Sequence, residues 1–98
     1  MIIKNLTFVV PVGQEKQFLQ LAFQATDAIK PWVEEIKVYK LMEQLDPESY
    51  NFALQLGFSD FPKLETFNRA ILEKMISDIT ESMAEQVLYF ESHLEKIF

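Results

Sequence analysis

Cysteine is absent from the 98 residues, and glycine and histidine are scarce. Without cysteine the chain can form no disulfide, no thiolate nucleophile and no cysteine-based zinc or iron–sulfur site. With only two glycines, a glycine-rich phosphate loop cannot be built. No apolar run reaches the roughly 18 residues of a membrane helix, and the first residues lack the basic and apolar regions of a signal peptide. We therefore expect a cytoplasmic protein with no membrane partner.

Positively charged residues are also few. Nine Lys and Arg residues stand against fifteen Asp and Glu residues, which gives a net charge of −6. Such a field repels phosphate backbones, so no nucleic-acid partner is expected. RNA recognition by an open sheet would also need exposed aromatic side chains, whereas the corresponding positions of the expected third strand are Asn51, Ala53 and Gln55.

Apolar residues are plentiful at 49%, and nine of them are Phe. The length fits a single domain over residues 1–98. A domain this short buries only about two thirds of the surface that its unfolded chain exposes. We therefore expect part of the apolar material to lie in the interface of a homodimer, the commonest symmetric assembly.

Hydrophobic periodicity predicts two consecutive strand–helix–strand units. Alternation of period two predicts strands, and apolar residues at three- and four-residue steps predict helices. The expected strands cover residues 2–10, 35–43, 50–58 and 86–97, and the expected helices cover 14–29 and 62–80. This order is typical of an α+β, ferredoxin-like β-α-β-β-α-β sandwich, with a four-stranded antiparallel sheet and two helices on one face.

The predicted topology leaves one face of the sheet open. The second and third strands should pair across the turn at 46–49, and the first and third strands should be central. Asn5, Thr7 and Gln55 would then be neighbours on the open face. The full set that we expect to bind a ligand there is Asn5, Thr7, Tyr39, Gln55, Tyr89 and His93.

Two interpretations of this open face compete. It is either an ordinary solvated sheet surface, or a dimer interface that encloses a pocket. Ile3, Val9 and Leu41 would lie uncovered on a solvated face, and uncovered aliphatic groups of this kind mark interaction sites. We therefore favour a homodimer through this face, with a possible small-molecule ligand between the sheets.

His93 is the only histidine, and Glu91 and Glu95 lie two residues to either side of it. Histidine titrates near neutral pH, and neighbouring carboxylates tune it, so proton transfer or metal binding is one interpretation. A surface histidine among surface glutamates is the commoner outcome in an acidic protein. Candidate catalytic residues are His93, Asn5 and Tyr39, and we predict neither a metal site nor a cofactor. Trp32 is expected to cover the edge of the core.

Three segments carry a family resemblance. Residues 1–7, 49–55 and 87–90 resemble a family of small bacterial proteins of unknown function that is common in Bacteroidetes. The resemblance implies a dimeric ferredoxin-like barrel, in which two sheets pack face to face. Glu91 and His93 depart from it, because an uncharged or apolar residue is expected there.

The wider group of dimeric barrels includes antibiotic-biosynthesis monooxygenases and haem-degrading enzymes. Asn5 resembles an asparagine that these enzymes use near the substrate. The haem-degrading members place a histidine and a tryptophan on or near the second helix, and residues 62–80 contain neither. The resemblance therefore implies no haem chemistry.

We expect a non-catalytic dimeric module that binds a small apolar or amphipathic ligand between its sheets. The alternative is a cofactor-independent small monooxygenase or isomerase that uses Asn5, Tyr39 and His93.

Overall fold

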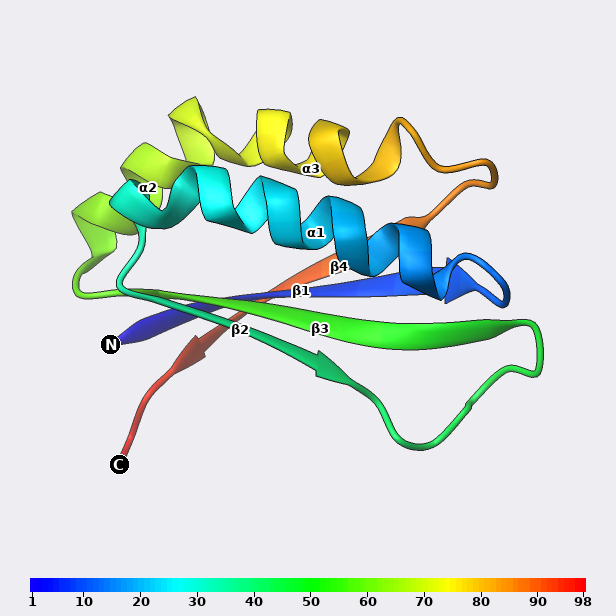
Figure 1. Cartoon of the computed structure of the whole chain (residues 1–98). Coiled ribbons are helices and arrows are strands. Elements are labelled where there is room, and N and C mark those ends of the chain that lie inside the picture. The colour runs from blue at the N-terminus through cyan, green and yellow to red at the C-terminus, as the bar shows by residue number, and fades with distance from the viewer.

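In the computed structural model, which describes residues 1–98, a layer of helices covers one face of a four-stranded sheet (Figure 1). The elements in chain order are β1 (Ile2–Pro11), α1 (Glu15–Ile29), the 3-10 helix η1 (Lys30–Trp32), β2 (Glu35–Lys40), β3 (Ser49–Phe58), α2 (Phe61–Ala70), α3 (Leu72–Thr80) and β4 (Leu88–Glu95).

The strand order is β2-β3-β1-β4, and each neighbouring pair is antiparallel. This order confirms the ferredoxin-like prediction, including the central position of the first and third strands and the pairing of the second with the third. The predicted alternation holds along β1 and β3. Asn5 is opposite Gln55, and Leu6 is opposite Leu54.

The even-numbered residues of β1 and β3 face the helices and form the core with them. Leu6, Phe8 and Leu56 are fully buried there. Phe18 of α1 packs against Phe8, with 5.2 Å between the ring centroids. Burial of these side chains on one face supplies the main driving force for folding.

The second helical segment differs from the single helix that we predicted over 62–80. It divides at Ile71, whose φ and ψ angles are −122° and −37°, into α2 and α3. The apolar residues Phe67, Ile71, Met75 and Ile79 recur at steps of four, and such a row drifts by about 40° around a straight helix at each step. The break lets both halves turn buried residues towards the sheet.

The last strand also corrects a prediction. In β4, Tyr89 is paired with Phe8, Glu91 with Leu6 and His93 with Lys4. Cross-strand partners point to the same side of a sheet, so Tyr89, Glu91 and His93 lie on the side of the helices, and their predicted place on the open face is wrong. Leu88, Phe90 and Leu94 lie on the open face instead.

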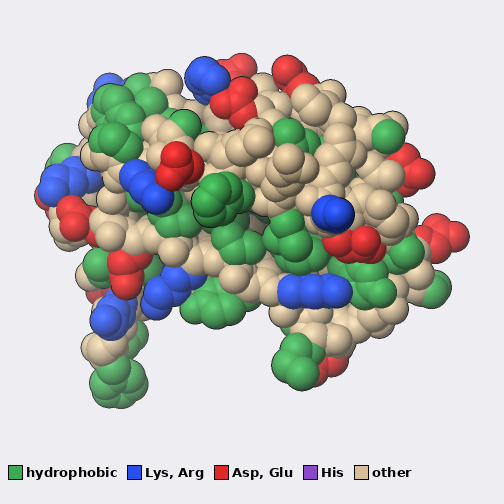
Figure 2. Space-filling view, in the orientation of Figure 1, with side chains coloured by type: hydrophobic (Ala, Val, Ile, Leu, Met, Phe, Trp, Pro, Cys, Tyr) green, Lys and Arg blue, Asp and Glu red, His purple; other side chains and the backbone are tan.

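Two segments project below the sheet, on the side away from the helices. They are the connection between β2 and β3 and the end of the chain after β4 (Figure 1). Both carry exposed apolar side chains, namely Met42, Leu45, Ile97 and Phe98. Figure 2 shows the underside of the molecule hollowed between these two projections. None of the helices combines the length and the apolar character that a membrane span needs.

Candidate functional site

The centre of the open face is a small hydrogen-bonded network of polar side chains. Gln55 Nε2 donates to Asn5 Oδ1 at 3.3 Å. Asn5 Nδ2 donates to Thr7 Oγ1 at 3.1 Å and to Ser92 Oγ at 3.3 Å. The register produces this arrangement, because Asn5 is opposite Gln55 on β3 and Ser92 on β4.

The network fixes the orientation of the Asn5 amide. Both of its N–H groups donate to hydroxyl oxygens, and its carbonyl accepts from Gln55. A hydroxyl that accepts one hydrogen bond keeps its own hydrogen available as a donor. Thr7 and Ser92 can therefore each still donate to a polar atom placed above the sheet.

Exposed apolar side chains lie on both sides of this polar centre. Their exposed fractions are 49% for Tyr39, 40% for Leu41, 51% for Leu88, 61% for Phe90 and 46% for Leu94. We call these five residues the apolar belt. Tyr39 and Leu41 belong to the β2 side of the sheet, and the other three belong to β4.

A hollow of about 440 Å³ lies between the polar centre and the β2 side of the belt. Thr7 and Asn51 contribute polar atoms, and Tyr39, Leu41 and Met42 contribute apolar surface. Small-molecule sites have volumes of roughly 300–1,000 Å³ and combine a mostly apolar lining with a few polar groups. The hollow therefore has the size and chemistry of a site for a small amphipathic molecule.

The structure brings together Asn5, Thr7, Tyr39 and Gln55 on the open face, as predicted. It does not bring Tyr89 and His93 to them. Tyr89 packs against Phe8 on the other side of the sheet, with 5.9 Å between ring centroids. That Tyr89 and His93 bind a ligand stays a prediction. They cannot contact the same ligand as Asn5 within one protomer, because they lie on the other side of the sheet.

A second polar cluster, which the sequence reasoning missed, surrounds Lys4. This lysine is only 1% exposed. Its ammonium donates to Glu91 Oε2 at 3.1 Å and lies 3.3 Å from His93 Nε2. Because an ammonium cannot accept a hydrogen bond, His93 can pair with it only through an unprotonated Nε2.

A signal for this cluster is present in the sequence. Lys4 occupies an inward position in a strand whose other inward residues are apolar, and a buried charge needs a partner. Glu91 and His93, at alternate positions of the last strand, supply it. Ser92, which completes the Asn5 network, gave no comparable signal.

Solved structures similar in fold include proteins of several descriptions. A protein from Deinococcus radiodurans, provisionally assigned as an antibiotic biosynthesis monooxygenase, has a TM-score of 0.69 at 11% identity and covers 100% of this chain and 96% of its own. An EthD family protein from Bacillus halodurans has a TM-score of 0.66 at 14% identity, and the match covers 99% of this chain and 100% of that protein. A protein from Jannaschia sp. CCS1 is described as a dimeric ferredoxin-like protein of unknown function. It has a TM-score of 0.57 at 15% identity, and the match covers 98% of this chain and 100% of that protein.

These likenesses show the fold. No curated protein matches the chain. Over residues 1–97 the sequence matches a protein family described as a domain of unknown function (DUF4286).

Proposed function

The chain belongs to this family of unknown function, and on that premise we propose that it is a non-catalytic homodimeric module that binds a small amphipathic or apolar ligand between two open sheet faces. The proposal includes a single domain over residues 1–98, a cytoplasmic location and an origin in bacteria of the Bacteroidetes type.

The observation that carries the proposal is the contrast in side-chain length across the open face. The apolar belt consists of leucines and aromatic residues, whereas the centre consists of Asn5, Thr7, Ala53 and Ser92, together with Gln55, whose side chain is held against Asn5 by a hydrogen bond. Two such faces that meet would touch first along their belts. The short central side chains would then leave a space whose polar atoms are aimed at its contents.

Uncovered apolar surface supports the dimer itself. The belt residues are between 40% and 61% exposed, and large exposed apolar patches mark interaction surfaces. The similar Jannaschia protein is described as dimeric. The projections that carry Met42 and Phe98 extend to the side on which a second copy would lie (Figure 1).

The enzymatic alternative is a cofactor-independent monooxygenase or isomerase. It is favoured by the likeness to the Deinococcus protein. The set that we expected to act in it, Asn5, Tyr39 and His93, is divided between the two sides of the sheet. Such an enzyme would have to work with Asn5 and Tyr39 and without the histidine of the same protomer.

One pair of substitutions tests the dimer. Phe90→Asp places a carboxylate in the belt, and the cost of removing that charge from water should give a monomer where the wild type is a dimer. Phe23→Asp is the matched control, because Phe23 is 72% exposed on α1, in the helical layer. Native mass spectrometry reports the assembly of both variants and the mass of any bound ligand.

Two results would contradict the proposal. One is a wild-type protein that stays monomeric at micromolar concentration. The other is a dimer that Phe23→Asp splits and Phe90→Asp leaves intact, since the interface would then lie on the helices.

A further inference from the structure

Helix α1 carries more apolar surface than the core covers. Phe18, Ala22 and Ile29 face the core and are at most 4% exposed. Leu19 and Phe23 lie beside them, four residues apart and therefore on one side of the helix, and both are exposed. The apolar stripe of α1 is therefore wider than its contact with the core.

The uncovered residues of α1 face the edge strand β2 across a groove of about 440 Å³. Ile36 and Val38 of β2 form the opposite wall, and their cross-strand partners belong to the core, so both point to the helical side of the sheet. Figure 2 looks onto this side of the molecule and shows hydrophobic side chains gathered between the helices and the sheet edge.

The floor of the groove is formed by short side chains. Ala22 and Thr26 line it and are buried. The Thr26 hydroxyl donates to the backbone carbonyl of Ala22 at 2.8 Å, so its polar atom already has a partner. The groove therefore offers a continuous apolar surface, and its volume falls in the range of small-molecule sites.

The groove is long rather than round. Leu19 and Lys30 both line it, and at about 1.5 Å per helical residue they lie roughly 16 Å apart along the helix axis. This shape suits an extended alkyl chain better than a compact ring.

The single charge in the lining stands at one end of the groove and is positive. Lys30 is the only charged residue that lines it. Its ammonium is paired with Asp27 at 2.8 Å, but both side chains are more than half exposed, and an exposed pair of this kind contributes little to stability. A ligand carboxylate can therefore take the place of Asp27.

The other charges of the protein leave this ammonium available to an anion. Glu34 and Glu35, which follow η1, are paired with Lys63 at 3.6 Å and Lys37 at 3.8 Å. More distant charges are screened beyond about 8 Å at physiological ionic strength. The net charge of −6 therefore has less influence on a bound ligand than the ammonium within the lining.

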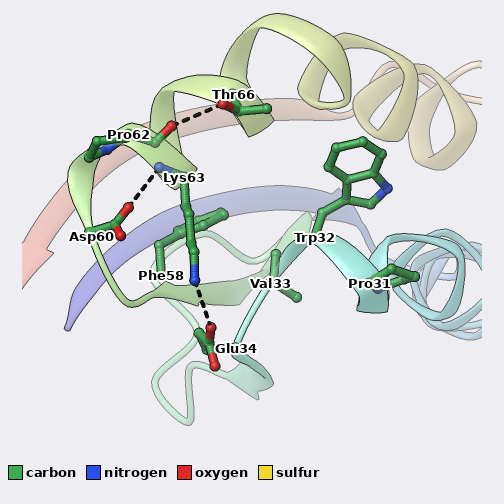
Figure 3. A pocket seen from close by; sticks show the side chains of 9 residues that line it. All are labelled: Pro31, Trp32, Val33, Glu34, Phe58, Asp60, Pro62, Lys63 and Thr66. Carbon is green, nitrogen blue, oxygen red and sulfur yellow. Dashed lines mark hydrogen bonds and ion pairs between the residues drawn. The ribbon is translucent and has the colours of Figure 1, made fainter.

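The pocket beside Trp32 has a different character. It occupies about 470 Å³ where α1 passes into η1 and α2 begins. Trp32, which we expected to cover the edge of the core, is 45% exposed there, and it points away from Glu34 (Figure 3). Lys63 is paired with Glu34, and its backbone N–H donates to Asp60. With its charged groups paired and apart from its aromatic ring, this pocket favours no single ligand chemistry.

We propose that the groove between α1 and β2 binds a straight-chain fatty acid. The alkyl chain lies over Ala22 and Thr26 between the two apolar walls, and the carboxylate pairs with the Lys30 ammonium. Burial of the methylene groups supplies the affinity, and the charge-assisted hydrogen bond selects the acid. This site is separate from the space between the sheets, because it lies on the helical side of β2 and no belt residue lines it.

Decanoate, decan-1-ol and decyltrimethylammonium test the charge requirement in ¹⁵N-resolved NMR titrations below the concentrations at which they form micelles. We expect decanoate to saturate and to shift amides of α1 and β2. The alcohol should bind about tenfold more weakly, because it lacks the charge-assisted bond, and the cation should not saturate.

The length of the ligand tests the groove itself. From hexanoate through octanoate to decanoate, the affinity should rise about two- to fourfold for each added methylene, because each is at least partly buried. An affinity that does not change with chain length would show that the alkyl chain is not bound.

Substitutions then assign the contacts. Lys30→Gln should weaken decanoate binding about tenfold and leave decan-1-ol unaffected. Lys74→Gln is the matched control, because Lys74 is also exposed and paired with an aspartate of its own helix at 2.8 Å, and it does not line the groove. Phe23→Asp places a carboxylate in the wall and should abolish decanoate binding.

The proposal is wrong if decanoate and decan-1-ol bind equally well, or if Lys30→Gln binds decanoate like the wild type. It is also wrong if decanoate does not saturate below its micelle-forming concentration. The Phe90→Asp variant separates this site from the dimer, because it should bind decanoate like the wild type whatever its assembly. Binding that is lost in Phe90→Asp and kept in Phe23→Asp would place decanoate on the open face instead.

Discussion

The two faces of the sheet are built from the same strands and have opposite characters. On the helical face, Phe8, Leu54 and Leu56 are at most 2% exposed. On the open face, Tyr39 and Phe90 are 49% and 61% exposed beside a polar centre. The helical face is therefore completed within one chain. The open face has the composition of a surface that a second body covers.

The polar groups have different roles on the two faces. Lys4 on the helical face is buried, and it is neutralised by Glu91. Asn5, its neighbour in sequence, points to the other face and is held by amide and hydroxyl groups without any charge. The Lys4–Glu91 pair, in which the lysine is buried and the glutamate is 37% exposed, satisfies the lysine's charge, whereas the Asn5 network still has hydrogen-bonding capacity for a ligand.

The largest effect that distinguishes the faces should come from removing one aromatic ring on each. Phe8→Ala leaves a cavity among fully buried side chains and should lower the free energy of unfolding by about 3–5 kcal/mol. Phe90→Ala should change the unfolding of the monomer by only about 0.5 kcal/mol. Urea denaturation of dilute protein, followed by circular dichroism, compares the two. Equal losses would show that the open face is part of the core of one chain.

The next largest effect should come from the charge pair on the helical face. Glu91→Gln leaves the Lys4 ammonium without its carboxylate partner and should lower the free energy of unfolding by about 1–3 kcal/mol. Lys4→Met keeps the length of the side chain and removes the buried charge, and we expect a smaller loss than for Glu91→Gln because the remaining Glu91 carboxylate is 37% exposed and can be solvated by water. Glu95→Gln, on the same strand, is the control and should have almost no effect. A Glu91→Gln protein as stable as the wild type would mean that water already solvates Lys4.

The smallest effect is expected at the centre of the open face. Asn5→Leu should keep the dimer and change the free energy of unfolding by no more than about 1 kcal/mol, because the added apolar area offsets three lost hydrogen bonds. Native mass spectrometry should show the dimer without its ligand. If the protein is instead an enzyme that uses Asn5, the same variant folds normally and loses turnover. A variant that no longer dimerises would show that the Asn5 network belongs to the interface contacts themselves.

Much of the fold follows from the sequence because three strands and the first helix have strong patterns. In β3, Phe52, Leu54 and Leu56 alternate with Asn51, Ala53 and Gln55, which leaves only one orientation that buries the large side chains. The pairing of β3 with β1 then follows, and it brings Asn5, Thr7 and Gln55 together. That part of the candidate site was predictable for the same reason.

The orientation of β4 did not follow, because neither of its faces is buried. All of its residues are exposed, so alternation of apolar and polar side chains does not indicate which set faces the helices. A shift by one residue exchanges the two faces of a strand. In the observed register Lys4 contacts Glu91 and His93, and Asn5 contacts Ser92. These contacts are made with another strand, so the sequence pattern of β4 alone does not reveal them.

The central position of β1 has a consequence for how the chain folds. β1 precedes all the other strands in the sequence, and it is hydrogen-bonded to β3 and to β4, the last strand of the sheet. Its inward lysine meets its partner 87 residues later. Sheets assembled from such distant segments fold slowly, since the long loops must close before their contacts can form. The helices can form from local contacts before β1 is paired, so the unpaired apolar β1 is the feature of the folding chain most open to aggregation.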